Sequence, residues 1–421
     1  MALDQVSRPD PAVLATTGKR MPGALVGLFA CASGLSVANV YYAQPLLDQL
    51  ATDFAISHAR VGGVITATQI GSVLALLLIV PLGDQLDRRR LMLAQLAVLI
   101  AGLVCVGLTR SPAVMFCAML AIGLLGTAMT QGLIAYAATA CLAQERGRVM
   151  GNVQGGVVIG LLLSRLAAGL ISDLAGWRWV YLGSSLAMLA LGVILWRVLP
   201  AQRPRAVTMS YPGLVRSMFS LLMQDRVLQI RGVIALLMFA VLSIFWSALV
   251  FLLISPPYGF SHTTIGTFGL VGVVGALAAA RAGAWADKGL GQWTSGLSLG
   301  LLILAWLALW FTSNSMVWLI VGVVLLDLGA QAIHVTNQSM IFSAHPDSHS
   351  RVVGCYMLFY ATGSGLGALA STSVYATSGW SGVCLLGAAV SVLALGFWAV
   401  TLRQMPDSPA SVAGTSAASS H

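Results

Sequence analysis

Two charged residues lie deep inside long apolar runs of this 421-residue sequence: Arg165 in the run 149–172 and Asp327 in the run 316–344. A charge at the centre of a membrane span costs at least ~2.5–3.5 kcal/mol on insertion scales, so it needs a compensating partner or a wet cavity. The two lie at similar estimated depth. We therefore predict that they pair in one state and separate in another, so that protonation of Asp327 frees Arg165.

Polar residues follow Asp327 at helical spacing within the same apolar run. Gln331 lies at i+4, His334 at i+7 and Gln338 at i+11, with Asn337 beside them. These positions share one helical face. A buried carboxyl and an imidazole can relay protons near neutral pH. The alternative is a polar seam between helices, satisfied by hydrogen bonds.

Other polar and aromatic side chains in the apolar runs are candidates for a substrate cavity, because buried polar groups need partners. With Gln331, Asn337 and Gln338, the candidates are Asn39, Tyr42, Gln69, Gln131, Trp246 and Tyr360. Packing between helices is the competing interpretation for each of them.

The elements that must position these residues are membrane-spanning helices. The sequence is 58% hydrophobic and 8% charged, whereas a soluble domain carries about 25% charged residues. A span needs about 20 mostly apolar residues. Such runs lie near 23–47, 60–82, 91–109, 112–141, 149–172, 178–199, 231–255, 263–283, 293–312, 316–344, 352–375 and 381–402. We predict an all-α membrane protein of 12 transmembrane helices.

The runs divide into two sets of six. We expect a cytoplasmic tail (1–22), an N-terminal bundle (23–199), a central loop with a surface helix (200–230), a C-terminal bundle (231–403) and a disordered tail (404–421). With both termini cytoplasmic, 18 of the 22 Lys and Arg lie inside, 3 lie outside and Arg165 lies in a span. Lys and Arg accumulate on the cytoplasmic side, so the net charge of +9 indicates orientation in a bacterial inner membrane and not a nucleic-acid partner.

The two halves repeat. Arg148-Val-Met-Gly151 matches Arg351-Val-Val-Gly354, and Gly176-Trp177 matches Gly379-Trp380, both at an offset of 203. Gly83-x3-Asp87 matches Gly283-x3-Asp287 at an offset of 200. These matches predict two pseudo-symmetric six-helix bundles with a substrate site between them, near the midplane.

The segments Gly83–Arg90 and Gly283–Gly291 resemble the signature between helices two and three of the major facilitator superfamily. Segments 38–46, 145–148, 176–178 and 337–339 are similar to its bacterial 12-helix drug and metabolite antiporters. The resemblance implies alternating access driven by protons, in a monomer. Two positions depart from it: Ala128 replaces a helix-four arginine, and Arg165 replaces a helix-five proline.

The loop motifs predict a gate in the cytoplasmic layer, since glycine, acid and base recur in both halves. Its residues are Gly83, Asp87, Arg88, Arg146, Arg148, Gly283, Asp287, Lys288 and Arg351. The alternative is that their positive charge only orients the chain.

We therefore expect a proton-coupled exporter of small organic molecules, with the proton as coupling ion and no other cofactor. The alternative is a proton-coupled symporter that imports an anionic metabolite through Arg165. A membrane enzyme or receptor is disfavoured, because the sequence lacks His-Glu-x-x-His, Gly-x-Ser-x-Gly, P-loop and clustered metal-ligand motifs.

Overall fold

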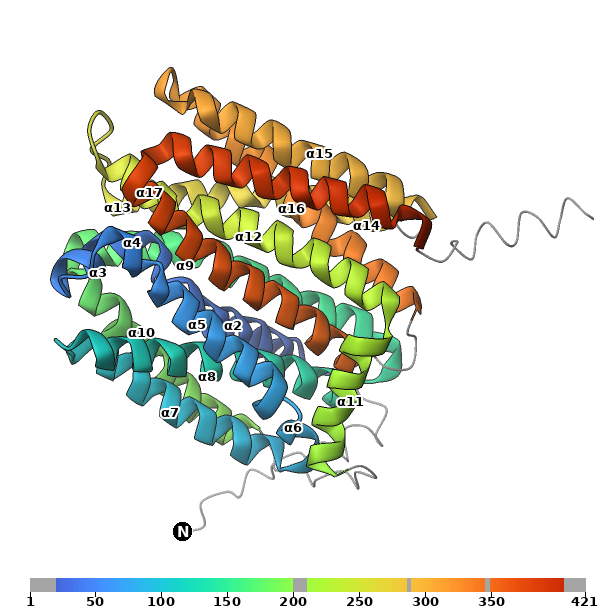
Figure 1. Cartoon of the computed structure of the whole chain (residues 1–421). Coiled ribbons are helices and arrows are strands. Elements are labelled where there is room, and N and C mark those ends of the chain that lie inside the picture. The colour runs from blue at the N-terminus through green and yellow to red at the C-terminus, as the bar shows by residue number, and fades with distance from the viewer. Residues whose placement is uncertain (1–19, 200–209, 286–288, 345–348, 405–421) are drawn as a thin grey trace, which may run out of the picture.

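The computed structural model describes residues 20–199, 210–285, 289–344 and 349–404, and the regular structure in these ranges is helical (Figure 1). Most of the two predicted tails, part of the central loop, and the predicted gate residues Asp287 and Lys288 lie outside them.

The first half contains six spans, two of which are interrupted. Its elements are α2 (Gly23–Tyr41), η1 (Gln44–Leu46), α3 (Leu47–Asp53), α4 (His58–Val61), α5 (Gly63–Leu74), the π-helical turn η2 (Ala75–Ile79), α6 (Leu82–Gln85), α7 (Arg88–Leu108), α8 (Pro112–Ala140), η3 (Ala143–Glu145), α9 (Arg146–Ala175) and α10 (Trp177–Val198).

The second half begins with the surface helix α11. Its elements are α11 (Tyr211–Gln224), α12 (Arg226–Ile254), α13 (His262–Thr267), η4 (Phe268–Val271), α14 (Gly272–Trp285), α15 (Gly291–Trp310), η6 (Phe311–Ser313), α16 (Met316–Ala344), α17 (His349–Thr401) and η7 (Leu402–Gln404).

The predicted fold of twelve spans is confirmed. Ten helical segments of the described chain are long and apolar enough to cross a membrane. One of them, Arg351–Gln404, has 54 residues and leaves helical geometry at Gly379, so it contains two spans. The interrupted series α13, η4 and α14 supplies the remaining span.

Backbone geometry also repeats between the halves. Gly176 separates α9 from α10 with φ +93°, and Gly379 divides α17 with φ +61°. A Cβ added to Gly160 would lie 2.2 Å from the Gly34 carbonyl oxygen, and one on Gly363 would lie 2.1 Å from that of Leu236. The contact between α2 and α9 thus recurs between α12 and α17, as small residues allow helices to approach closely.

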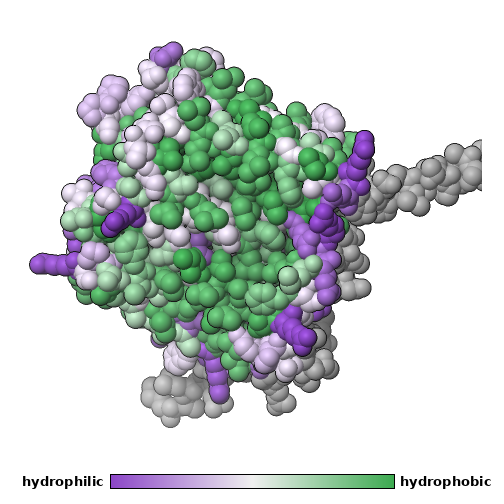
Figure 2. Space-filling view, viewed as in Figure 1, coloured by the Kyte–Doolittle hydropathy of each residue, from purple (hydrophilic) through white to green (hydrophobic). Residues whose placement is uncertain are grey.

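The surface is suited to lipid. Figure 2 shows hydrophobic residues over the middle of one face and hydrophilic residues at its two edges. Large apolar side chains are exposed along the spans, among them Leu163, Leu174, Leu186 and Trp196. Exposed apolar surface on this scale is typical of a membrane protein and not of a soluble monomer.

The bundle has two distinct ends. At the termini end, the described chain begins at Arg20 and finishes at Gln404, and α11 lies beside it (Figure 1). The far end contains the turns after Asp53, Leu108, Ala175, Ile254 and Ser313, and the break at Gly379.

The halves meet tightly near the far end. Thr66 donates a 2.8 Å hydrogen bond to the Gly365 carbonyl oxygen, and Ser373 donates one of 3.1 Å to that of Ala59. Towards the termini end, a cavity of about 330 Å³ lies between η2, α7 and α8 of the first half and α11 and α17 of the second.

Candidate functional site

Arg165 lies at the contact between the two halves. Its Nε and Nη2 donate hydrogen bonds of 3.1 and 2.9 Å to Oε1 of Gln44, which belongs to the same half. Its guanidinium carbon lies 4.0 Å from the ring centroid of Trp246 on α12 and 5.8 Å from that of Tyr41. The side chain is therefore held by a neutral amide and by aromatic rings, and none of these partners carries a negative charge.

The local sequence explains how Gln44 reaches this site. Pro45 follows it and lies in the first turn of η1, where α2 has already ended. Proline lacks a backbone N–H and interrupts a helix at this point. The bend in the first span thus places Gln44 against Arg165.

Asp327 lies against the interrupted helix formed by α13, η4 and α14, as Arg165 does. A Cβ on Gly269 would lie 3.3 Å from side-chain atoms of Arg165, and one on Gly272 would lie 3.1 Å from Oδ2 of Asp327. Glycines at 266, 269, 272 and 275 line the contacts of this helix with the two charged residues. Because these glycines lack side chains, α9 and α16 can both pack closely against the interrupted helix, which places Arg165 and Asp327 against it.

The two charges lie near mid-depth. Arg165 precedes the end of α9 by ten residues and Asp327 follows the start of α16 by eleven, which is about 15 Å for each at 1.5 Å per residue. The hydrocarbon core is about 30 Å thick. They interact electrostatically, but among the described residues no ion pair joins them directly. Asp327 is 8% exposed.

His334 and Gln338 of α16 lie in a separate cluster within the second half. His334 Nδ1 is 3.0 Å from the Tyr356 hydroxyl, and its Nε2 is 3.4 Å from the Gln338 amide nitrogen. The ring of Phe239 contacts both His334 and Tyr360 edge to face. Gln331, half-buried, lies one turn beyond Asp327. The structure thus places Trp246 and Asp327 around Arg165, and His334, Gln338 and Tyr360 in this cluster.

A third buried charge was missed by the sequence analysis, which assigned Arg231 to the cytoplasmic loops. It lies in α12, fully buried, and its Nη1 donates to Ser295 at 2.8 Å and to Asn337 at 3.4 Å. Asn337 also donates to the Arg231 carbonyl oxygen at 3.4 Å. Because α12 begins at Arg226, the helix enters the bundle earlier than the apolar run at 231 suggested.

Three of the remaining candidates for the substrate cavity contact neighbouring helices. Asn39 accepts a 2.7 Å hydrogen bond from Ser184 and donates one to Leu35, so it joins α2 to α10. Tyr42 packs edge to face against Tyr181. Gln69 is buried on α5, next to Gly365 of the other half.

Gln131 lines the cavity at the termini end, together with Gly83, Arg88 and Arg351. Arg88 donates to the carbonyl oxygens of Gly83 (2.8 Å) and Ala135 (3.1 Å), and so ties the loop to α8.

Other predicted gate residues take local roles. Asp87 caps α7 by accepting a 2.9 Å hydrogen bond from the Arg89 backbone N–H. Arg148 pairs with Glu145 at 3.1 Å, and Glu145 also accepts from the Met21 N–H. The Met21 hydrogen bond is the main cause that lowers the pKa of Glu145. Arg146 is exposed, and Gly283 lies in α14.

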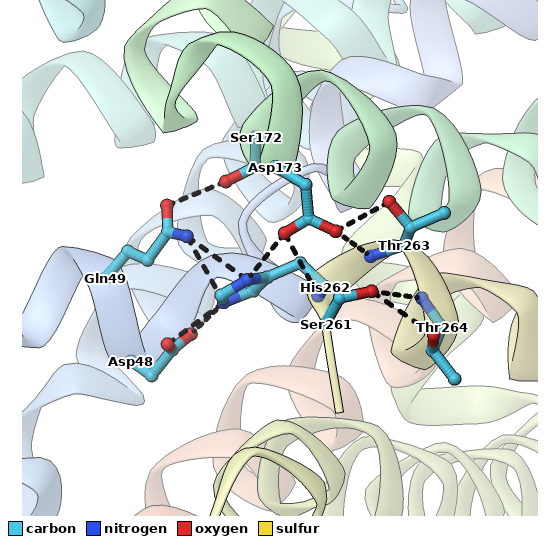
Figure 3. A network of polar contacts seen from close by, with 8 residues as sticks. All are labelled: Asp48, Gln49, Ser172, Asp173, Ser261, His262, Thr263 and Thr264. Atoms are coloured by element: carbon cyan, nitrogen blue, oxygen red, sulfur yellow. Dashed lines mark hydrogen bonds and ion pairs between the residues drawn. The ribbon is translucent and has the colours of Figure 1, made fainter. Parts of the chain in front are cut away.

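A second polar network at the far end was also missed (Figure 3). His262 of the second half lies between Asp48 of α3 and Asp173 of α9, at 3.0 and 3.2 Å. Gln49 and Thr263 complete it. The sequence did not single these residues out because they lie at the ends of three separate spans, just outside the apolar runs, where a charge is not unusual.

Comparison with known proteins places this geometry in a family. The Major Facilitator Superfamily model matches residues 29–339 and 232–420. The uncharacterized transporter YgaY of Escherichia coli O157:H7 is 40% identical over 382 residues, 89% of this chain and 95% of that protein. The uncharacterized MFS-type transporter YybF of Bacillus subtilis is 23% identical over 371 residues, 85% of this chain and 87% of that protein.

Solved structures share the fold at low identity. A bacterial homolog of the human lysosomal transporter Spinster, in an inward-facing and unoccupied conformation, superposes with a TM-score of 0.76 and 13% identity, covering 91% of this chain and 97% of that one. Together with the two six-helix halves, the family model and the relative at 40% identity establish that the chain belongs to the major facilitator superfamily of membrane transporters.

Proposed function

We propose that this transporter exports small organic molecules in exchange for protons, with Asp327 as the proton-carrying residue and Arg165 as its counterpart. One observation carries the proposal: within the part of the chain that the structure describes, a buried arginine contacts both halves without a carboxylate at ion-pair distance, while a buried acid lies against the same interrupted helix. A charge is retained in a span when it takes part in transport.

The contacts of Arg165 suggest how it responds to the state of the transporter. Gln44 belongs to its own half and Trp246 to the other. When the halves rock apart at the far end, the contact with Trp246 must lengthen, whereas the contact with Gln44 can persist. Opening therefore exposes a positive charge and an aromatic face together, which suits an amphipathic organic molecule with an anionic group.

The coupling step follows from the charge balance. While Asp327 is ionised, its negative charge partly offsets that of Arg165. When Asp327 takes a proton, Arg165 loses this compensation and reorients towards water, so that the protonated state releases the substrate, as exchange for protons requires. Differential stabilisation of the two states by the proton is what thermodynamic coupling requires.

The buried guanidinium of Arg165 equally favours a second candidate, a symporter that imports an anionic metabolite. Vesicle orientation distinguishes the two. We would assay everted and right-side-out vesicles with a panel of fluorescent amphipathic dyes and aromatic carboxylates, under an acid-inside or acid-outside gradient.

Export predicts accumulation in everted vesicles with an acid interior, abolished by a protonophore. Import predicts accumulation in right-side-out vesicles with an acid exterior. Transport that ignores the protonophore in both orientations would overturn proton coupling. In the same assay, Asp327→Asn should lose accumulation driven by the proton gradient. Asp53→Asn is its matched control, because Asp53 is a surface acid already bound to Trp177 and Arg178 at the far end.

A further inference from the structure

The far-end network has the chemistry of a proton-binding site that joins the two halves (Figure 3). The His262 ring is buried, and its Nε2 lies 3.0 and 3.1 Å from the two carboxylate oxygens of Asp48. Its Nδ1 lies 3.2 Å from Oδ1 of Asp173. Ionised carboxylate oxygens only accept hydrogen bonds, so both ring nitrogens must donate. Imidazole donates from both nitrogens only when it is protonated.

The neighbouring amide fits this assignment. Ser172 donates a 2.7 Å hydrogen bond to Oε1 of Gln49, which directs the Gln49 amide nitrogen towards the ring. That nitrogen lies 3.2 and 3.3 Å from Nδ1 and Nε2 of His262. An atom equidistant from both ring nitrogens at this range lies over the ring and not along either nitrogen's in-plane axis. The two axes therefore remain directed at Asp48 and Asp173.

The network connects the halves through backbone as well as side chains. Asp173 accepts hydrogen bonds from the backbone N–H groups of His262 (3.2 Å) and Thr263 (2.7 Å), and from the Thr263 hydroxyl. A Cβ on Gly169 would lie 2.1 Å from the His262 carbonyl oxygen, so glycine is needed for α13 to lie against α9. Separation of the halves at the far end would break every one of these contacts.

We propose that His262 is a second proton-binding site of this transporter, and that its protonated form holds the far end closed between Asp48 and Asp173. The inference does not rest on Asp327 or on the direction of transport. Among the described residues, these two acids are the charged groups that contact the ring, one from α3 and one from α9.

Titration of His262 gives the sign of the effect. It precedes the predicted span 263–283. Burial alone would lower its pKa, but hydrogen bonds and charge from Asp48, and then from Asp173, raise the pKa above its usual value. Protonated His262 therefore stabilises the closed far end fully below the usual histidine pKa of about 6.5. This stabilisation is lost as the pH rises through the raised pKa of His262. Each unit by which closure raises the pKa changes the closed-to-open ratio about tenfold.

The test measures the distance across the far end as a function of pH. Spin labels would be placed at Ser111→Cys and Asn314→Cys, exposed turn positions of the two halves, with the six native cysteines replaced. Double electron–electron resonance at pH 5.5 should give one short distance, and at pH 8.5 a longer population several-fold larger than at pH 5.5. His262→Gln should remove this pH dependence, and Asp48→Asn should weaken it.

The matched control is His58→Gln. His58 also lies at the far end, but it is exposed, and its ring meets that of Phe251 in a tilted contact with the centroids 5.0 Å apart. It should behave as the unmodified protein. An unchanged pH response in His262→Gln, or no response in the parent protein, would overturn the proposal. Nitrogen-15 NMR of labelled histidine in the parent protein provides a readout that needs no stable variant. At about pH 6.5, the usual histidine pKa, the His262 signal should be mostly that of imidazolium, and a mostly neutral ring there would also overturn the proposal.

Discussion

Replacement of Arg165 by methionine separates a transport role from a structural one. The guanidinium donates two hydrogen bonds to one oxygen of Gln44 and stacks on Trp246. The two hydrogen bonds share one acceptor oxygen and count as a single interaction with a charged group, about 1.5–3 kcal/mol, and a desolvated cation–π contact contributes about 2 kcal/mol. Against this, a charge at mid-span costs about 2.5–3.5 kcal/mol. Arg165→Met should therefore reduce the free energy of unfolding by no more than about 2.5 kcal/mol.

Transport should fall even though the variant still folds. If Arg165 binds the substrate's anionic group, its loss removes about 1.5–3 kcal/mol, which is a ten- to hundredfold fall in transport at low substrate. Thermal unfolding in detergent and probe uptake by proteoliposomes would be measured on the same preparation. Arg178→Met is the matched control, because Arg178 also stacks on a tryptophan, at 4.4 Å, but lies at the surface of the far end. A large loss of stability in Arg165→Met, with transport per folded molecule unchanged, would refute the reasoning.

Two further predictions concern glycines that shape the bundle. Gly160→Ala should lower the unfolding free energy by about 1–3 kcal/mol, the usual cost of overpacking, because its Cβ would lie 2.2 Å from the Gly34 carbonyl oxygen. The control Gly155→Ala has open space around it and should be neutral or slightly stabilising. Equal melting temperatures of the two variants would contradict this prediction. Gly379→Ala should cost about 1–3 kcal/mol, since a φ of +61° with ψ −158° is essentially restricted to glycine, and the same applies to Gly176→Ala; an unchanged unfolding curve for both would show that the breaks relax.

The sequence was sufficient to predict the fold because a lipid bilayer permits few kinds of backbone structure. Backbone groups in lipid must be satisfied within each segment, so apolar runs of sufficient length predict helices directly. The repeats at 176 and 379 marked real breaks, as both glycines adopt positive φ. The boundary at 231 was less accurate because hydropathy treats Arg231 as a polar residue and stops the apolar run there. In the structure Arg231 is buried inside the helix by contacts with Ser295 and Asn337.

The candidate site was only partly predictable, for a physical reason. Asp327 and Arg165 stood out because each costs free energy in a span. Gln44 did not, since its importance depends on the bend at Pro45 and on which helix faces it. His262, Asp48 and Asp173 come together only through the packing of three spans. Helical periodicity predicts neighbours within one helix, and therefore gave the face of His334 and Gln338 but no contact between helices.

The central claim is that a proton on Asp327 couples the transport cycle to the gradient. The direct measurement compares Asp327→Asn with the parent protein in proteoliposomes, using one transported probe in two assays: exchange without a gradient and accumulation driven by a proton gradient. We predict that the variant exchanges the probe at a rate close to that of the parent but no longer accumulates it. Gradient-driven accumulation by Asp327→Asn at the parent level would contradict the account.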